Sequence, residues 1–502
     1  MPYVFSEKPY NWPTHRVDAD KLGFVEHLEE TTNQKLYVAH RLDKTTTGAM
    51  VFATTADSAK NLQEHFQNRN VKKEYYFVTD KKINDTSLNI ESFITEKDKA
   101  YYSDTHKNPN SQTVLTWVCS HNKYHLWKAE PLSGKTHQIR LHAKDAGIPI
   151  VGDATYGGSD YPFLLLHSHK ITVPDAPEHI SPLPVYFSDL ENLENPLLAR
   201  SIRAIEDRIL LFKKVPDCVR WIHKEIPWLC VDQLGDHLWF QIFETHTGYE
   251  NLVNEILSYL KQRLNRNFEY HVQVMPNRGM SPNQKLVSDS GASRWQAKEH
   301  EVTYEFRSDS GSSYGLFLDQ RKNRDWVLQN AGDKTLLNLF CYTGGFSLCA
   351  LHAGAKEVTS VDTSKNTLEW LETNIKLNSF NSEIHKSWST DARIFLKGAK
   401  QRDKQYDLVI CDPPSFSRSK EGIFKIENDF KDLLDKCLQV LAPKGTLLFS
   451  TNFEGWLMAD FKEQVEQTLP KDYKVLKYAS SDVDYEPPTQ NRILKMVFIS
   501  KL

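Results

Sequence analysis

Two separate segments of the chain place an aspartate and an arginine in patterns that could do chemistry. HRLDKTTTG puts Asp43 two residues after Arg41, in a turn rich in threonine that closes at Gly48. SGKTHQIRLH puts Arg140 three residues after His137. An arginine beside an aspartate favours the ionised carboxylate, and a carboxylate kept charged in a cleft can act as nucleophile or base. The pair alone also fits a structural ion pair.

The full strings around these residues are more specific, and they resemble the RluA-type pseudouridine synthases. KEYYFV with Tyr75, IPIVGDATYGG over 148–158 and LLLHSHKITV over 164–173 continue the pattern in the family's order. The resemblance implies that Asp43 is the catalytic residue, that Arg140 holds and orients it, and that Tyr75 stacks on the base and assists proton transfer. It also implies that Arg41 contacts the RNA, that neither cofactor nor metal is needed, and that the uridine must leave the base stack.

A second group of polar residues follows strand ends after about residue 312. Asp362 ends one strand, where an acidic side chain can accept hydrogen bonds from ribose hydroxyls. Asp391 follows another strand and could meet an adenine amino group. In DPPSF, Asp412 and the backbone carbonyls can accept from a nucleobase, while Phe416 offers a face for stacking. A dinucleotide site fits poorly, because no third glycine follows Gly344 and Gly345 at the G-x-G-x-x-G spacing.

These residues resemble a class I S-adenosylmethionine-dependent methyltransferase. GLFLDQR, NLFCYTGGF, VDTSKNTLEW, DPPSFSRSK and FSTNFEG are similar to the large-subunit rRNA methyltransferases of the RlmI and RlmK type. The resemblance implies S-adenosylmethionine contacts at six positions: Asn338, Phe340, Gly344, Asp362, Asp391 and Asp412.

The atom that receives the methyl group is narrowed by the cysteines. Methylation of cytosine carbon 5 needs a thiolate that attacks the ring. The fifth strand of this part ends in FSTNF, which has no cysteine. Cys411 precedes Asp412, so strand alternation predicts that it points into the sheet. A nitrogen target, as in the guanine methyltransferases of the group, is therefore favoured.

Composition sets the limits for these readings. A length of 502 residues predicts two or three domains. No apolar run approaches the ~20 residues of a membrane span, and MPYVFSEKPYNW lacks the sections of a signal peptide. Seven cysteines without CxxC pairing indicate reduced thiols and a cytoplasmic protein. We expect no metal site, because His121–His125 and His167–His169 lack cysteine or carboxylate partners.

The net charge of −3 gives no general attraction for RNA phosphates. A local basic cleft is compatible with that total, although the same residues could equally be solvated surface charges. The candidates for such a cleft are Arg16, Arg41, Lys72, Lys73, Lys135 and Arg140.

The pattern of elements predicts a multidomain chain. Residues 1–190 are expected to form an α+β pseudouridine synthase core with a mixed or antiparallel sheet, and 191–226 a helical linker. Residues 227–311 suggest a small α+β domain, with a hairpin turned at 234–236, a helix over 249–264 and a flexible loop over 277–293. From 312 to 502, strands alternate with helices, which predicts a parallel, Rossmann-like methyltransferase domain.

Three functions remain open from the sequence. The first is a bifunctional enzyme that makes pseudouridine and methylates a base, with large-subunit rRNA as the expected partner and no obligate protein partner evident. The second is a methyltransferase whose first domain is inactive and docks RNA, since residues 45–47 are three threonines where the family usually has Asp-Thr-Ser. The third, a nicotinamide-dependent oxidoreductase, is disfavoured by the glycine spacing and the DPP loop. The sequence leaves rRNA versus tRNA undecided.

Overall fold

The computed structural model describes residues 2–16, 23–212, 214–223, 225–243, 248–275, 285–288, 292–311, 313–419, 422–485 and 494–502. The chain divides into two compact units, residues 1–214 and 215–502. Among the described residues, no helix is both long and apolar enough to cross a bilayer. The expected multidomain fold is confirmed.

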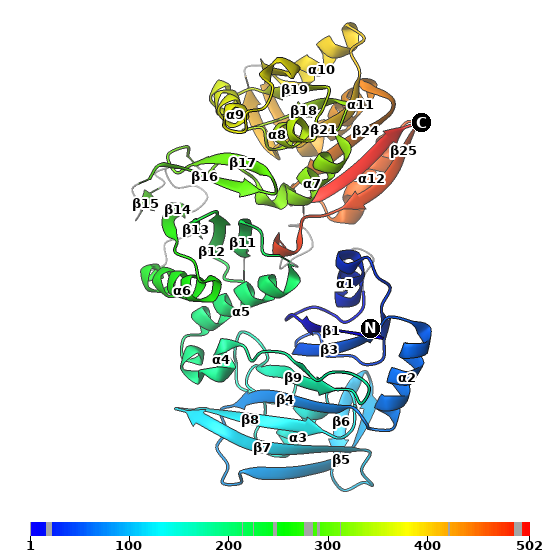
Figure 1. Cartoon of the computed structure of the whole chain (residues 1–502), viewed down its shortest axis with the longest axis vertical. Helices are drawn as coiled ribbons and strands as arrows, with labels where there is room; N and C mark the ends of the chain where they lie inside the picture. The colour runs from blue at the N-terminus through cyan, green and yellow to red at the C-terminus, as the bar shows by residue number, and fades with distance from the viewer. Residues whose placement is uncertain are drawn as a thin grey trace. The chain divides into compact units, whose positions relative to one another are not determined.

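The first unit is built on one mixed sheet (Figure 1). Its neighbouring strands pair antiparallel, except β3 and β9, which pair parallel. The main path runs β1 (Tyr3–Lys8), β3 (Thr47–Ala53), β9 (Leu166–Thr172), β4 (Lys72–Thr79), β8 (Tyr124–Pro131), β7 (Ser111–His121), β5 (Ser87–Lys97), β6 (Ala100–Asp104). Two short strands, β2 (Tyr37–Val38) and β10 (His179–Ile180), pair with β3 and β9.

Six helical segments accompany this sheet: α1 (Phe24–Thr32), α2 (Ala56–Gln67), α3 (Gln138–Asp145), α4 (Val185–Ser188), the 3₁₀ turn η1 (Leu190–Leu193) and α5 (Pro196–Leu211). The sequence predicted α2 with an Asp or Ser cap. The structure instead uses Thr55, which exchanges hydrogen bonds with Ser58 in a capping box.

The helix expected in the linker, α5, packs within the first unit. Its Asp207 accepts a hydrogen bond from the backbone N–H of Tyr10 at 2.9 Å. Ile202 and Ile205 are buried, as the apolar spacing predicted. The first unit therefore extends to residue 214 instead of ending at 190, because the apolar face of α5 is covered by the unit's own residues.

The second unit begins with a five-stranded sheet in the order β11 (Cys218–Ile222), β12 (Leu229–Leu234), β13 (His237–Phe243), β14 (Glu269–Met275), β15 (Lys285–Ser288). The predicted hairpin joins β12 to β13, and α6 (Tyr249–Leu264) leads from β13 to the parallel β14. Two expectations need correction. β11 places the start of this sheet before 227, and β15 is a strand inside the segment expected as a loop, most of which lies outside the described residues.

A hairpin, β16 (Arg294–Glu299) with β17 (Val302–Arg307), leads to a seven-stranded sheet. Its order is β20 (His385–Ser389), β19 (Glu357–Asp362), β18 (Thr335–Leu339), β21 (Tyr406–Cys411), β24 (Leu441–Thr451), β26 (Lys495–Lys501), β25 (Tyr473–Ala479). The first five strands are parallel, and β26 is antiparallel to both its neighbours.

Helices cover both faces of this sheet (Figure 1). The core on one face includes α7 (Arg321–Asn330), α8 (Gly345–His352) and α9 (Lys365–Leu377). The core on the other includes α10 (Ala392–Gln401), α11 (Ile426–Gln439) and α12 (Met458–Thr468). Shorter pieces are the 3₁₀ turns η2 (Leu318–Gln320), η3 (Ser382–Ile384) and η4 (Val483–Tyr485), and the hairpin β22 (Phe416–Ser419) with β23 (Gly422–Lys425).

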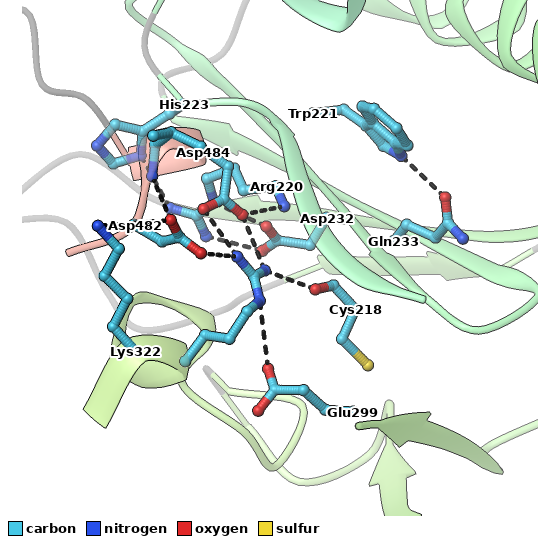
Figure 2. A network of polar contacts seen from close by, with 12 residues as sticks. Cys218, Arg220, Trp221, His223, Asp232, Gln233, Glu299, Lys322, Asp482 and Asp484 are labelled. Atoms are coloured by element: carbon cyan, nitrogen blue, oxygen red, sulfur yellow. Dashed lines mark hydrogen bonds and ion pairs between the residues drawn. The ribbon is translucent and has the colours of Figure 1, made fainter. Parts of the chain in front are cut away.

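A buried ionic network ties parts of the second unit together (Figure 2). The guanidinium of Arg321 donates to Asp484 at 2.9 and 3.0 Å, to Asp482 at 3.1 Å and to the carbonyl of Cys218 at 2.6 Å. Arg220 makes a two-bond pair with Asp232, at 2.7 Å for each bond. Because a buried charge is costly unless it is paired, this network fixes the start of α7 against β11 and η4.

Candidate active sites

The first unit contains a pocket of about 770 Å³ at the turn between β2 and β3. All four residues predicted for the pseudouridine synthase site line it: Arg41, Asp43, Tyr75 and Arg140. Of the other residues proposed for a basic cleft, Lys73 and Lys135 also line it, whereas Arg16 and Lys72 do not. The structure therefore gathers residues from distant parts of the chain at one polar pocket.

Arg140 stands between two carboxylates. Its Nη1 lies 3.3 Å from Oδ2 of Asp43, while its Nε and Nη2 donate to Asp153 at 2.7 and 2.8 Å. The side chain of Asp153 is only 1% exposed. Burial lowers the pKa of Arg140, but the hydrogen bonds to Asp153 raise it further, and the net shift is upward. Arg140 thus remains charged and is held mainly by Asp153.

Asp153 is a residue that sequence reasoning missed. It lies in the IPIVGDATYGG string, which carried the family resemblance but was given no chemical role. Asp153 also accepts from the backbone N–H groups of Thr155 and Tyr156. A rigid carboxylate that grips two nitrogens of Arg140 leaves the third, Nη1, aimed at Asp43.

Asp43 is held less tightly than Arg140. Its side chain is 24% exposed, and its hydrogen bond from Arg140 is long. Nε2 of His137 lies 3.7 Å from Asp43, while Nδ1 of the same ring pairs with the hydroxyl of Tyr156 at 2.8 Å. Burial lowers the pKa of His137, which favours a neutral ring at pH 7. Asp43 is therefore open to the pocket and available to react.

Tyr75 lines the same pocket from β4 and is 8% exposed. Burial raises the pKa of its phenol to about 12, so the hydroxyl is protonated at neutral pH and can donate a proton. Beside it, Nζ of Lys73 donates to the carbonyl of Ser133 at 2.7 Å, and burial lowers its pKa to about 8. The pocket therefore combines a carboxylate, an aromatic face and cationic groups.

The second unit has a pocket of about 520 Å³ at the carboxyl ends of β18, β19 and β21. Ligands of open parallel sheets bind at this edge. Five of the residues predicted for the cofactor and substrate line it: Phe340, Asp362, Asp391, Asp412 and Phe416.

Two carboxylates of this second pocket are fixed by nearby donors. Asp362 accepts from the backbone N–H groups of Tyr342 at 3.0 Å and Ser364 at 2.9 Å. Asp391 accepts from the backbone N–H of Arg393 at 2.8 Å and pairs with its guanidinium. Each carboxylate oxygen has more than one acceptor site, so Asp362 can also accept from ribose hydroxyls. The pocket therefore fits a nucleoside-containing cofactor.

Asn338 and Gly344 do not line the pocket. Asn338 is fully buried in β18, where it donates to Ser347 at 2.9 Å. Gly344 has φ +90°, and a Cβ there would lie 2.1 Å from Cδ1 of Leu371. The geometry gives both residues a part in packing the strand and turn that carry Phe340.

Asp412 and the nearby cysteines have different surroundings. Asp412 accepts from Oγ of Ser450 at 2.6 Å, and burial raises its pKa to about 6. Cys411 is fully buried in the core beside Cys437, which confirms that it points into the sheet. Cys341 lines the pocket, but burial raises the pKa of its thiol well above the usual value. In the described part of the chain, no cluster of side chains could hold a metal ion.

Comparison with known proteins gives each unit a class. Residues 2–145 match the family of RNA pseudouridylate synthases. Residues 276–474 match the S-adenosylmethionine-dependent methyltransferases. The chain thus joins a region of the first family to a region of the second.

Individual relatives match the second region. The chain is 37% identical over 169 residues to ribosomal RNA large subunit methyltransferase K of Neisseria meningitidis, covering 32% of this chain and 48% of the relative. It is 35% identical over 195 residues to the putative ribosomal RNA large subunit methyltransferase YwbD of Bacillus subtilis, covering 36% and 49%. The chain therefore spans about half the length of these curated relatives.

Solved structures agree with the fold of the second unit. The crystal structure of SMU.776, a putative methyltransferase complexed with SAH, is 26% identical with a TM-score of 0.51, covering 57% of this chain and 76% of that one. A putative SAM-dependent methyltransferase from Streptococcus mutans is 23% identical with a TM-score of 0.52, covering 65% and 83%. The second similarity concerns the fold alone.

Proposed function

We propose that the chain is a cytoplasmic, bifunctional RNA-modifying enzyme. Its second unit transfers a methyl group from S-adenosylmethionine to a base of large-subunit rRNA, with a guanine nitrogen favoured. Its first unit converts uridine in RNA to pseudouridine. The observation that carries the proposal is that each unit has its own pocket, lined by the acidic and aromatic residues that its reaction needs.

For methyl transfer, S-adenosylmethionine supplies a methyl group on a positively charged sulfur. Asp362 would accept from the ribose hydroxyls, and Asp391 would meet the adenine amino group. Phe416 is 50% exposed and offers a stacking face to the target base. The names of the relatives support rRNA as the substrate.

For pseudouridine formation, the uridine must be flipped out of the stack into the first pocket, which costs a few kcal/mol unless the base is unpaired. Asp43 then attacks or deprotonates the nucleotide as the glycosidic bond breaks. Arg140, fixed by Asp153, keeps the Asp43 carboxylate oriented. Tyr75 stacks on the detached uracil and donates a proton while carbon 5 bonds to the ribose.

One observation favours a second candidate, in which the first unit only docks RNA. The relatives described above are named only as methyltransferases. Against this, Asp43, Tyr75 and Arg140 are all present and all face one pocket, whereas a retired site would be expected to have lost at least one of them.

The experiment that separates these candidates uses Asp43→Asn in the full chain, with Asp85→Asn, an exposed position, as the matched control. Large-subunit rRNA from cells lacking the protein is treated with each variant, and pseudouridines and methylated bases are mapped. We expect Asp43→Asn to lose pseudouridine formation while methyl transfer and RNA affinity persist. Substantial isomerase activity in Asp43→Asn would remove the assignment of Asp43, and none in the unmodified chain would favour the docking module.

Cofactor identity has its own test in the variant Asp362→Ala. Losing a carboxylate that hydrogen-bonds ribose hydroxyls costs ~1.5–3 kcal/mol, so calorimetry should show S-adenosylmethionine binding at least about tenfold weaker. Binding of NAD, or unchanged affinity for S-adenosylmethionine in the variant, would count against the assignment.

A further inference from the structure

Asp319, in η2, lines the second pocket with a carboxyl group that has no partner side chain. Among the described residues, no donor outside Asp319 itself makes a hydrogen bond to this group. Burial raises the pKa of its carboxyl, the effect of Arg220 and Arg324 lowers it, and Asp484 raises it. A carboxyl group held in protein without donors is costly, which indicates that its donors come from a ligand.

The cations around Asp319 are engaged elsewhere. Arg324, which is 2% exposed, pairs with Glu299 and donates to the carbonyl of Phe317 at 2.7 Å. Arg220 is taken by Asp232, and Arg321, the next residue but one, by Asp484 (Figure 2). The chain around Asp319 is therefore held rigidly while its own carboxylate is left open to the pocket.

Asp412 is the neighbour of Asp319 in the pocket. Burial is the main cause of its raised pKa, and the charge of Asp319 raises it further, so the two groups are close enough to influence each other. Ser450 donates to Asp412 at 2.6 Å and receives a hydrogen bond from Gln320 at 3.2 Å. Ser450, Gln320 and Arg324 are the groups that oppose the upward shift at Asp412.

We propose that Asp319 and Asp412 act as a pair that binds the exocyclic amino group of the target base and takes the proton released on methylation. This inference rests on the proposed methyltransferase function and deepens it. An exocyclic amine has two N–H donors, so one can be accepted by each carboxylate. Accepting both raises the electron density on the nitrogen, whose lone pair must form the new bond.

The step balances without any further reagent. The amine nitrogen bonds to the methyl carbon as the bond from that carbon to the cofactor sulfur breaks, and the electron pair of the broken bond stays on the sulfur. The nitrogen then loses one proton to the carboxylate pair, which later releases it to water. The substrate class is therefore a base with an exocyclic amine, and a ring carbon or ring nitrogen without N–H would not use the pair.

The experiment compares Asp319→Asn with the unmodified full chain, and Asp309→Asn, an exposed position, serves as the matched control. Three properties are measured: methyl incorporation into large-subunit rRNA from cells lacking the protein, the chemical identity of the methylated nucleoside, and S-adenosylhomocysteine affinity by calorimetry. We expect the methyl-transfer rate of Asp319→Asn to fall by about 10²-fold, as for loss of a general base. S-adenosylhomocysteine affinity should be unchanged, which also shows that the variant is folded.

The pH profile of the rate adds a readout that a merely structural role would not move. In Asp319→Asn the negative charge beside Asp412 is gone, so the inflection of the residual rate should move to lower pH. An unchanged rate and profile, methylation at a ring atom, or weakened S-adenosylhomocysteine binding would each overturn the pair. If the unmodified chain binds S-adenosylhomocysteine but methylates no rRNA, the proposed function itself fails and the pair with it.

Discussion

Replacing Asp412 with asparagine should make the second unit more stable while it ends methyl transfer. Burial and the charge of Asp319 raise the pKa of Asp412 from 3.8 to about 6. The ionised carboxylate is thus disfavoured in the folded protein, and an amide of the same shape avoids this cost. The amide oxygen can still accept the hydrogen bond from Ser450, so no partner is lost.

The magnitude follows from the linkage between pKa and stability. Each tenfold change in acidity corresponds to about 1.4 kcal/mol, so the penalty on Asp412 is roughly 3 kcal/mol above pH 7. Because the folded-state pKa is raised, the penalty disappears as pH falls below the unfolded value. At pH 5 it should be roughly half as large.

Scanning calorimetry of the full chain can measure this gain, with the transition of the second unit identified as the one that S-adenosylhomocysteine raises. For a unit of this size, roughly 3 kcal/mol corresponds to a rise in Tm of at least about 5 °C at pH 8. Asp309→Asn, at an exposed site, should leave Tm unchanged. A Tm for Asp412→Asn that is unchanged or lower at pH 8, or a gain that is the same at pH 5 and pH 8, would refute the reasoning.

Two further outcomes are expected. Asp153→Asn should leave Arg140 poorly held, so single-turnover pseudouridine formation should fall by roughly 10²-fold while methyl incorporation is unchanged; full isomerase activity would mean that Asp153 does not position Arg140. Gly344→Ala should lower the Tm of the second unit by more than Gly354→Ala, because both positions have positive φ but only Gly344 faces a clash, with Leu371; equal effects would show that the clash is relieved at no cost.

The sequence predicted those site residues that lie at the ends of elements with a clear pattern. Asp362 and Asp412 follow strands whose apolar runs are easily recognised, and the structure brings both to one pocket. Cys411 was predicted to point inward from strand alternation alone, and it does. Helix α6 has the bounds that its apolar periodicity indicated.

Contacts between distant segments could not be predicted in this way. Nothing near Arg321 in the chain indicates that its partner is Asp484, since no periodic pattern spans that separation. The pairing of Arg140 with Asp153 was missed for a related reason, because Asp43 was the more conspicuous carboxylate. Local patterns gave no sign that Asn338 turns away from the pocket, since its direction depends on packing against α8.

The position of β26 has a consequence for how the protein is made. This strand is the last in the sequence, yet it lies between β24 and β25 inside the sheet. The core of the second unit therefore cannot close until the ribosome has added nearly the whole chain, whereas every strand of the first unit precedes residue 214. At translation rates of ~5–20 residues per second, the first unit can be folded for tens of seconds before the second, and it could meet RNA during that interval.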